Sequence, residues 1–267
     1  MMRTIAELLS LDGRAALVTG GAGHLGRAVG ETLAELGATV AVLDVDEEGA
    51  RAGVEALCRI RPGAAVAVPC DLADEVATRA AIRETTTKLG GLDVVVHCAG
   101  YVGTTAAPGW AVPFEQQTVE AWDQALRVNL TAAFVIVQTA RDALAASGRG
   151  AVVLFGSIYG MVGPDFRLYE GTALANPAGY AASKGGLLQL TRYLAMLLAP
   201  RVRVNAISPG GVWRDQPDAF HRRYVARTPL GRMGIEEDLK GAVAYLSGDL
   251  SAYVTGHNLV VDGGWTA

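Results

Sequence analysis

The sequence predicts an α/β fold, a doubly wound and mostly parallel seven-stranded sheet with helices on both faces. The first observation behind this prediction is that short apolar runs alternate with longer segments of helical spacing. The second is that no linker, charge block or internal repeat divides the 267 residues. We therefore expect one compact domain that spans residues 1–267.

Seven apolar runs, each bounded by glycine or polar residues, have the length expected of strands. They are residues 15–18, 39–43, 64–68, 94–96, 151–155, 202–206 and 258–261. Helical spacing is clearest in residues 25–36, 119–145 and 180–198. This alternation indicates βαβ units around a parallel sheet, with right-handed crossovers.

The bulk composition argues against several classes of function. The net charge is −4 and the basic residues are scattered, so we expect neither nucleic acid nor a membrane surface as a partner. Cys58, Cys70 and Cys98 have no metal-ligand spacing, which favours reduced thiols and no metal site. Because no apolar stretch reaches the roughly 18 residues that cross a bilayer, we expect a cytoplasmic protein.

A glycine-rich turn follows the first predicted strand. Gly20, Gly23 and Gly26 lie between that strand and an alanine-rich helix, the context in which dinucleotides bind. Glycine lets the backbone approach a pyrophosphate, and the amino end of the helix favours the anion. The turn therefore predicts a nucleotide cofactor.

An acidic residue indicates which cofactor binds. Asp44 follows the run 39–43 and lies 18 residues after Gly26, where a carboxylate accepts hydrogen bonds from ribose hydroxyls and repels a 2′-phosphate. Arg27 and Arg51 are the basic residues that would instead favour NADP if they lay beside the 2′-phosphate. The expected cofactor is NAD, with NADP the less favoured alternative.

Further motifs follow in order along the chain. Asp71-Leu72, the turn His97-Cys98-Ala99-Gly100, Pro209-Gly210 and the closing Val261-Asp262-Gly263-Gly264 are joined by Asn129, Ser157, Tyr180 and Lys184. With these residues the chain resembles the short-chain dehydrogenase/reductase family, in its short single-domain branch, from about Leu11 to the end. The resemblance implies a Rossmann fold and a homo-oligomer, for which we expect a tetramer built on residues 119–145 and 180–198.

The resemblance also implies site residues. The catalytic residues would be Asn129, Ser157, Tyr180 and Lys184, with Asn129 bending its helix and holding a water that connects Lys184 to solvent. Asp71-Leu72 would lie against the adenine and Pro209-Gly210 beside the nicotinamide. The full set of expected cofactor-binding residues is Gly20, Gly23, His24, Leu25, Gly26, Asp44, Asp71, Leu72, Ala99, Gly100, Tyr180, Lys184, Pro209, Gly210 and Val212.

The glycine turn departs from the family pattern. The short branch usually has TGxxxGxG, whereas this chain has His24 in place of a glycine and so satisfies TGxxGxxG, the spacing of the extended branch. Two interpretations remain open: His24 lies near the phosphates, or it is a surface residue at the start of a helix. No role is assigned to His97.

The chemistry of the four residues suits proton transfer. Tyr180 and Lys184 are four residues apart and so lie on one side of a helix. A free phenol has a pKa of about 10, and we expect the adjacent ammonium to lower it so that Tyr180 acts as general acid and base. Ser157 follows the run 151–155, where its hydroxyl can bind the substrate oxygen.

Two segments are expected to surround the substrate. Ser157 and Tyr180 are 23 residues apart, more than is usual in the family that the chain resembles, because residues 163–172 are inserted between them. This loop and the residues after it carry the polar side chains Asp165, Arg167, Tyr169, Glu170 and Asn176. Residues 211–234, which contain aromatic and basic side chains, suit a lid. The loop alternatively satisfies its own polar groups at the surface.

The sequence thus predicts an NAD-dependent oxidoreductase that interconverts a secondary alcohol and a ketone, on a polar polyhydroxylated substrate such as a sugar or cyclitol derivative. Three alternatives stay open. They are an NADP-dependent ketoacyl or ketone reductase, a nucleotide-sugar epimerase or dehydratase, and a non-catalytic module that senses NAD.

Overall fold

The computed structural model describes residues 2–103 and 105–267. Its seven strands form one parallel sheet in the order β3-β2-β1-β4-β5-β6-β7. They are β1 (Ala15–Thr19), β2 (Thr39–Asp44), β3 (Ala65–Pro69), β4 (Val94–His97), β5 (Gly150–Phe155), β6 (Val202–Pro209) and β7 (Asn258–Val261). Each corresponds to one predicted run, so the predicted fold class is confirmed.

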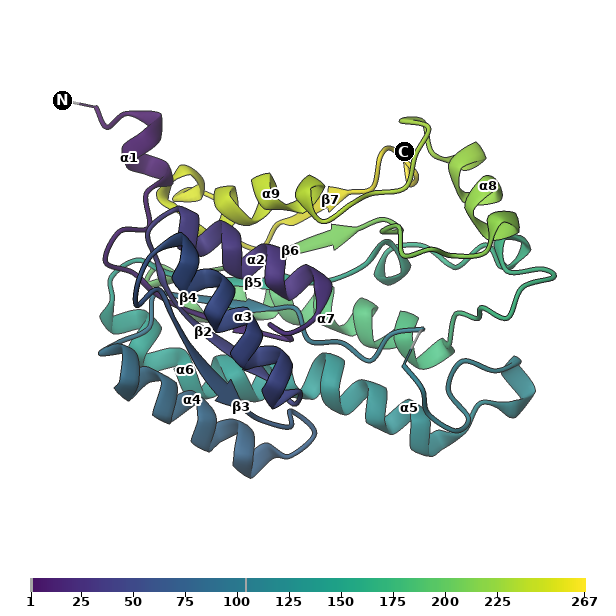
Figure 1. Cartoon of the computed structure of the whole chain (residues 1–267), viewed down its shortest axis with the longest axis horizontal. Helices are drawn as coiled ribbons and strands as arrows, with labels where there is room; N and C mark the ends of the chain where they lie inside the picture. Colours follow the sequence, from purple (N-terminus) through teal and green to yellow (C-terminus); the bar gives the residue numbers. More distant parts are fainter. Residues whose placement is uncertain (1, 104) are drawn as a thin grey trace.

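Helices cover both faces of the sheet (Figure 1). On one face lie α2 (His24–Glu35), α3 (Glu47–Ile60) and α9 (Glu237–Ser247), and on the other α4 (Glu75–Leu89), α6 (Ala132–Ala146) and α7 (Ala178–Leu198). Successive strand residues alternate between the two cores: Ala16 and Val18 of β1 pack toward the first set of helices, and Leu17 packs toward the second.

The strand order reverses between β1 and β4, which lie side by side at the centre of the sheet. Ligands of such sheets bind in the crevice outside the carboxyl ends of the strands at this point. In Figure 1, α5 (Val119–Leu126) and α8 (Asp218–Arg227) lie at the end of the molecule opposite α1 (Ile5–Leu9) and the amino terminus.

One predicted helix is interrupted. Residues 119–145 form α5, a π-helical turn at Arg127–Thr131 and then α6, so the regular helical bonding changes around Asn129, the residue at which the resemblance implies a bend. The turn contains Asn129, whose side chain is fully buried and bonded to neighbouring elements. Turns of this kind arise where an extra residue is accommodated in a helix, often at a functional site.

Within residues 2–103 and 105–267, none of the helices has the length and apolarity needed to span a bilayer. The same residues hold no group of three or more His, Cys, Asp or Glu side chains placed to bind a metal ion.

Candidate active site

Helix α7 presents Tyr180 in its first turn and Lys184 one turn later. The Lys184 Nζ donates a hydrogen bond of 2.7 Å to the carbonyl oxygen of Phe155, at the end of β5. It lies 5.7 Å from the centroid of the Tyr180 ring. Burial lowers the pKa of Lys184 to about 8, because a charged ammonium is disfavoured away from water.

The pKa of Tyr180 does not move in the expected direction. Burial of the phenol raises its pKa, and a hydrogen bond with Ser157 opposes the increase. The expectation that Lys184 lowers this pKa is therefore wrong for the structure described here. The physical reason is that desolvation dominates, while the ammonium is engaged by the Phe155 carbonyl and lies beside the ring.

Ser157 follows β5 and begins a 3₁₀ turn at Ile158–Gly160. Its Oγ accepts a hydrogen bond of 3.2 Å from the amide of Tyr159. The turn packs tightly on α7: a Cβ on Gly160 would lie 2.7 Å from the carbonyl carbon of Lys184. Gly160 therefore sets how closely Ser157 approaches the helix that carries Tyr180. The sequence analysis did not single out Gly160. Its position three residues after Ser157 is the signal that could have identified it.

Asn129 lies behind this pair rather than in contact with it. Its Nδ2 donates to Ser183 Oγ at 2.9 Å and to the carbonyl of Tyr101 at 3.1 Å, and its Oδ1 accepts from the amide of Tyr101 at 2.5 Å. The side chain thus ties the loop after β4 to α7, the helix that carries Tyr180 and Lys184. Its expected connection to Lys184 through a water stays a prediction.

The glycine turn after β1 has the predicted geometry. Gly20 has a φ of +67°, and a Cβ there would lie 2.7 Å from the Cα of Ala99. A Cβ on Gly26 would lie 2.0 Å from the carbonyl oxygen of Gly20, so α2 can approach the turn because this residue is glycine. Gly23 precedes α2, and no side chain caps the first turn of the helix. Its free amides fit a pyrophosphate.

The carboxylate of Asp44 is held at the end of β2 beside this turn. Its Oδ2 accepts from the amide of Ala22 and its Oδ1 from the amide of Asp46, both at 3.0 Å. This fixed negative charge fits ribose hydroxyls and opposes a 2′-phosphate. Arg51 pairs with Glu47 at 2.5 Å.

His24 begins α2, with 74% of its side chain exposed. Its Nδ1 lies 3.8 Å from Glu236, which also pairs with Arg214 at 2.8 Å. His24 is thus at the surface of the structure and at the mouth of the predicted pyrophosphate site. The two interpretations drawn from the sequence both remain compatible with this position.

The Asp71-Leu72 pair follows β3. The Oδ1 of Asp71 accepts a hydrogen bond of 2.9 Å from the amide of Ala73, which fixes the turn. Leu72 is buried in the core beneath the sheet. A role of this pair against the adenine stays a prediction.

A cavity of about 300 Å³ opens at the carboxyl ends of β4, β5 and β6. Eight of the predicted site residues line it: Leu25, Gly100, Ser157, Tyr180, Lys184, Pro209, Gly210 and Val212. The others do not: Gly20, Gly23, His24, Gly26, Asp44, Asp71, Leu72, Ala99 and Asn129. The crevice joins the start of α2 to Tyr180, Lys184 and the turn after β6, so it fits a nicotinamide and its ribose.

The inserted loop contributes fewer groups to the cavity than predicted. Tyr169 and Asn176 line it. Asp165, Arg167 and Glu170 do not. The Asp165 carboxylate pairs with Arg167 of the same loop at 2.8 Å and with Arg227 of α8 at 2.6 Å. The expectation that these three charged groups overhang the substrate is wrong, and for Asp165 and Arg167 the structure favours the alternative that the loop satisfies its own polar groups.

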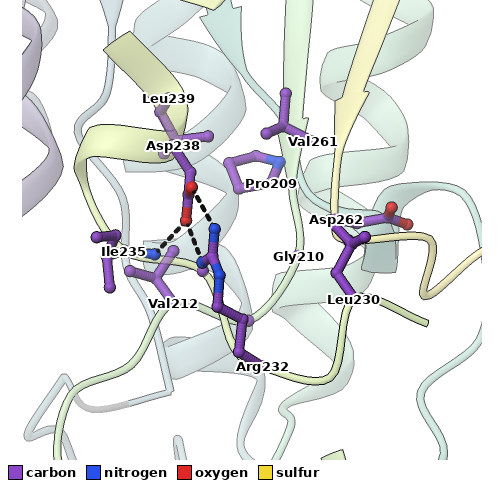
Figure 2. Close-up of a pocket in the computed structure, with 13 residues that line it drawn as sticks. Pro209, Gly210, Val212, Leu230, Arg232, Ile235, Asp238, Leu239, Val261 and Asp262 are labelled. Carbon is purple, nitrogen blue, oxygen red and sulfur yellow. Dashed lines mark hydrogen bonds and ion pairs between the residues drawn. The ribbon is translucent and has the colours of Figure 1, made fainter. Parts of the chain in front are cut away.

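The segment 211–234 forms the opposite wall. Phe220 and Tyr224 of α8 line the cavity, and the Tyr224 hydroxyl accepts a hydrogen bond from the amide of Gly211. A smaller cavity of about 130 Å³ adjoins the same turn after β6. Figure 2 shows the Arg232 guanidinium facing the Asp238 carboxylate there, with two hydrogen bonds of 2.6 Å. This ion pair holds the carboxyl-terminal end of the segment 211–234 against α9.

Comparison with known proteins agrees with this geometry. Residues 20–266 match the family model described as enoyl-(acyl carrier protein) reductase. The chain is 32% identical over 261 residues to 2,5-dichloro-2,5-cyclohexadiene-1,4-diol dehydrogenase of Sphingobium indicum, covering 96% of this chain and 97% of the relative. It is 33% identical over 267 residues to D-threitol dehydrogenase of Mycolicibacterium smegmatis, covering 96% and 94%.

A solved structure extends the likeness to three dimensions. The short chain dehydrogenase of Leptospira borgpetersenii with bound NAD+ superposes with a TM-score of 0.84 at 30% identity, covering 100% of this chain and 97% of that one. The match spans the whole sheet, the glycine turn and the helix that carries Tyr180 and Lys184. The chain belongs to the short-chain dehydrogenase/reductase family and is an oxidoreductase of that family.

Proposed function

We propose that this protein is an NAD-dependent dehydrogenase that interconverts a secondary alcohol and a ketone on a neutral, polyhydroxylated substrate such as a cyclitol or sugar derivative. The observation that carries the proposal is the lining of the cavity, where the hydroxyls of Ser157, Tyr159, Tyr169 and Tyr180 gather. The activities for which two relatives are named, on a cyclic diol and on threitol, support the same class of substrate.

Each catalytic residue has a defined task in this proposal. As phenolate, Tyr180 takes the proton of the alcohol during oxidation, and as phenol it gives that proton back during reduction. The Ser157 hydroxyl donates a hydrogen bond to the same substrate oxygen and stabilises the charge that develops on it. Lys184 places its ammonium beside the phenol, and Asn129 positions α7 through Ser183. Bound NAD would accept or supply the hydride.

The choice of NAD rests on Asp44. Its carboxylate is fixed by two backbone amides next to the glycine turn, and a 2′-phosphate placed there would meet a like charge. The solved relative with bound NAD+ supports this choice. The residues expected to hold the nucleotide are the glycine turn, the start of α2, Asp44, Asp71, Leu72, Ala99 and Gly100.

We further propose a cytoplasmic homotetramer without nucleic acid or membrane partners. Large apolar side chains are exposed on the helices expected at the interfaces, including Trp122 of α5, Phe134 of α6 and Met196 of α7. Light scattering on the purified protein measures the mass directly. A mass of four chains agrees with the proposal, and a monomer contradicts it.

The proposal is tested by oxidation of an alcohol panel, followed as absorbance of the reduced cofactor at about 340 nm, a wavelength that reports hydride transfer to nicotinamide. The panel contains cyclohexanol, the cyclohexanediols, threitol and an aldose, each with NAD and NADP separately. Turnover of a hydroxylated member with NAD supports the proposal. No turnover of any member with NAD contradicts it.

A second function is favoured by one observation. The chain is 30% identical over 261 residues to the 3-oxoacyl-[acyl-carrier-protein] reductase of Aquifex aeolicus, so reduction of a ketoacyl substrate with NADP is the competing assignment. It predicts turnover of an acetoacetyl thioester and preference for NADPH.

A further inference from the structure

A chain of hydrogen bonds runs along the wall of the cavity. Asn176 Nδ2 donates to the Tyr169 hydroxyl at 3.3 Å, and the Tyr169 hydroxyl donates to the Tyr159 hydroxyl at 3.0 Å. All three residues line the cavity that also contains Ser157 and Tyr180. The chain thus joins the inserted loop to the turn that directly follows Ser157.

The direction of these bonds leaves a donor at one end. Each tyrosine hydroxyl has one proton, and the bond between Tyr169 and Tyr159 uses only one of the two. The other proton therefore needs another acceptor, and the described residues supply none in this structure. Burial and the neighbouring phenols raise the pKa of Tyr159, so its hydroxyl stays protonated and able to donate.

The other end of the chain leaves an acceptor. Asn176 is 8% exposed, and its Oδ1 is buried with no hydrogen-bond partner among the described residues. A buried carbonyl oxygen without a partner destabilises a protein, which makes it unusual in a native structure. The wall therefore combines one unused donor and one unused acceptor.

We propose that Tyr159 and Asn176 bind a second hydroxyl group of the substrate, on a carbon other than the one that is oxidised, with Tyr169 as a positioning residue. A hydroxyl both accepts from Tyr159 and donates to Asn176, whereas an ether oxygen can only accept and a methylene can do neither. Lys184 carries the one charged side chain among the described lining residues, so the group recognised is neutral. This inference rests on the proposed function.

The test compares substrates that differ in one group. The probes are cyclohexane-1,2-diol, cyclohexane-1,3-diol and cyclohexane-1,4-diol, their mono-O-methyl ethers, and cyclohexanol, with NAD as oxidant. For the wild-type enzyme we expect kcat/KM for the best diol to exceed that for cyclohexanol by about tenfold or more, and to exceed that for its ether.

Variants assign the preference to residues. We expect Tyr159→Phe and Asn176→Leu each to lower the ratio of diol to cyclohexanol by about tenfold, through a higher KM for the diol. Tyr253→Phe, at a fully exposed tyrosine far along the chain from the cavity lining, serves as the matched control and keeps the ratio. NADH binding and the thermal midpoint of each variant show that the fold is intact.

The possible results distinguish a failure of this inference from a failure of the proposed dehydrogenase function. Equal kcat/KM for the diols and cyclohexanol in the wild type, or an unchanged ratio in both folded variants, overturns the role of Tyr159 and Asn176 while the dehydrogenase function stands. Failure to oxidise any panel member with NAD overturns the proposed function and this inference with it.

Discussion

The buried ammonium of Lys184 makes a quantitative prediction about stability. The side chain is 4% exposed, and its pKa falls from 10.5 to about 8 on folding. Lys184→Met keeps the length of the side chain but removes the charge. The wild-type protein therefore carries a cost of desolvating a charge that the variant lacks.

The direction in which stability changes with pH follows from proton binding by the folded and unfolded states. Between about pH 8 and pH 10.5 the unfolded chain binds more protons at Lys184 than the folded protein does, so this residue makes wild-type stability rise with pH in that window. A pKa displacement of this size corresponds to about 3 kcal/mol in the free energy of unfolding. The other titrating groups are shared by both proteins, so their contributions largely cancel in the comparison.

The assay is urea unfolding of the cofactor-free wild type and Lys184→Met at a series of pH values from about 7 to 10.5, the range set by the two pKa values, at one protein concentration. We expect the stability of the wild type relative to the variant to increase by up to about 3 kcal/mol across this range. Parallel pH profiles for the two proteins would show that Lys184 is not desolvated, and would refute the reasoning.

Three further predictions concern the packing and selectivity of the site. Gly160→Ala should destabilise the protein by about 1–3 kcal/mol and lower kcat, because the new Cβ meets the Lys184 backbone. Gly163→Ala, at a position with open space around it, should change neither stability nor kcat, and urea unfolding and steady-state rates measure both quantities. Asp44→Ser should raise the ratio of kcat/KM with NADP to that with NAD by about tenfold, since a charge that repels the 2′-phosphate is removed; an unchanged ratio would contradict the role of Asp44. Asn129→Ala should cost about 1–3 kcal/mol in stability and also lower kcat, since buried partners in Ser183 and Tyr101 lose their bonds; wild-type kcat in the variant would exclude a positioning role.

The fold was readily predictable from the sequence because its signals are local. Apolar runs and glycine turns identified all seven strands, and the carboxyl ends of parallel strands necessarily gather the residues that follow them. The break at Arg127–Thr131 was not predictable from helical spacing. It depends on the bonds of Asn129 to Ser183 and Tyr101, which are distant in the sequence.

The sequence placed Ser157, Tyr180 and Lys184 at one cavity but could not predict their energetics. The spacing of Tyr180 and Lys184 correctly put both side chains at one cavity, yet it could not show that burial outweighs the charge of the ammonium. The same limit applies to the inserted loop. Its charged residues suggested substrate contacts, but the position of Arg227 on α8 decides that Asp165 is used to hold the loop.

The central claim is that the Tyr180 hydroxyl transfers the proton, whereas other residues supply most of the binding of the nucleotide. The most direct measurement compares Tyr180→Phe with the wild type in steady-state oxidation and in NADH binding. We expect kcat to fall by about 10²-fold to 10⁴-fold or more, with the Kd for NADH essentially unchanged. Wild-type turnover in the phenylalanine variant would contradict the account.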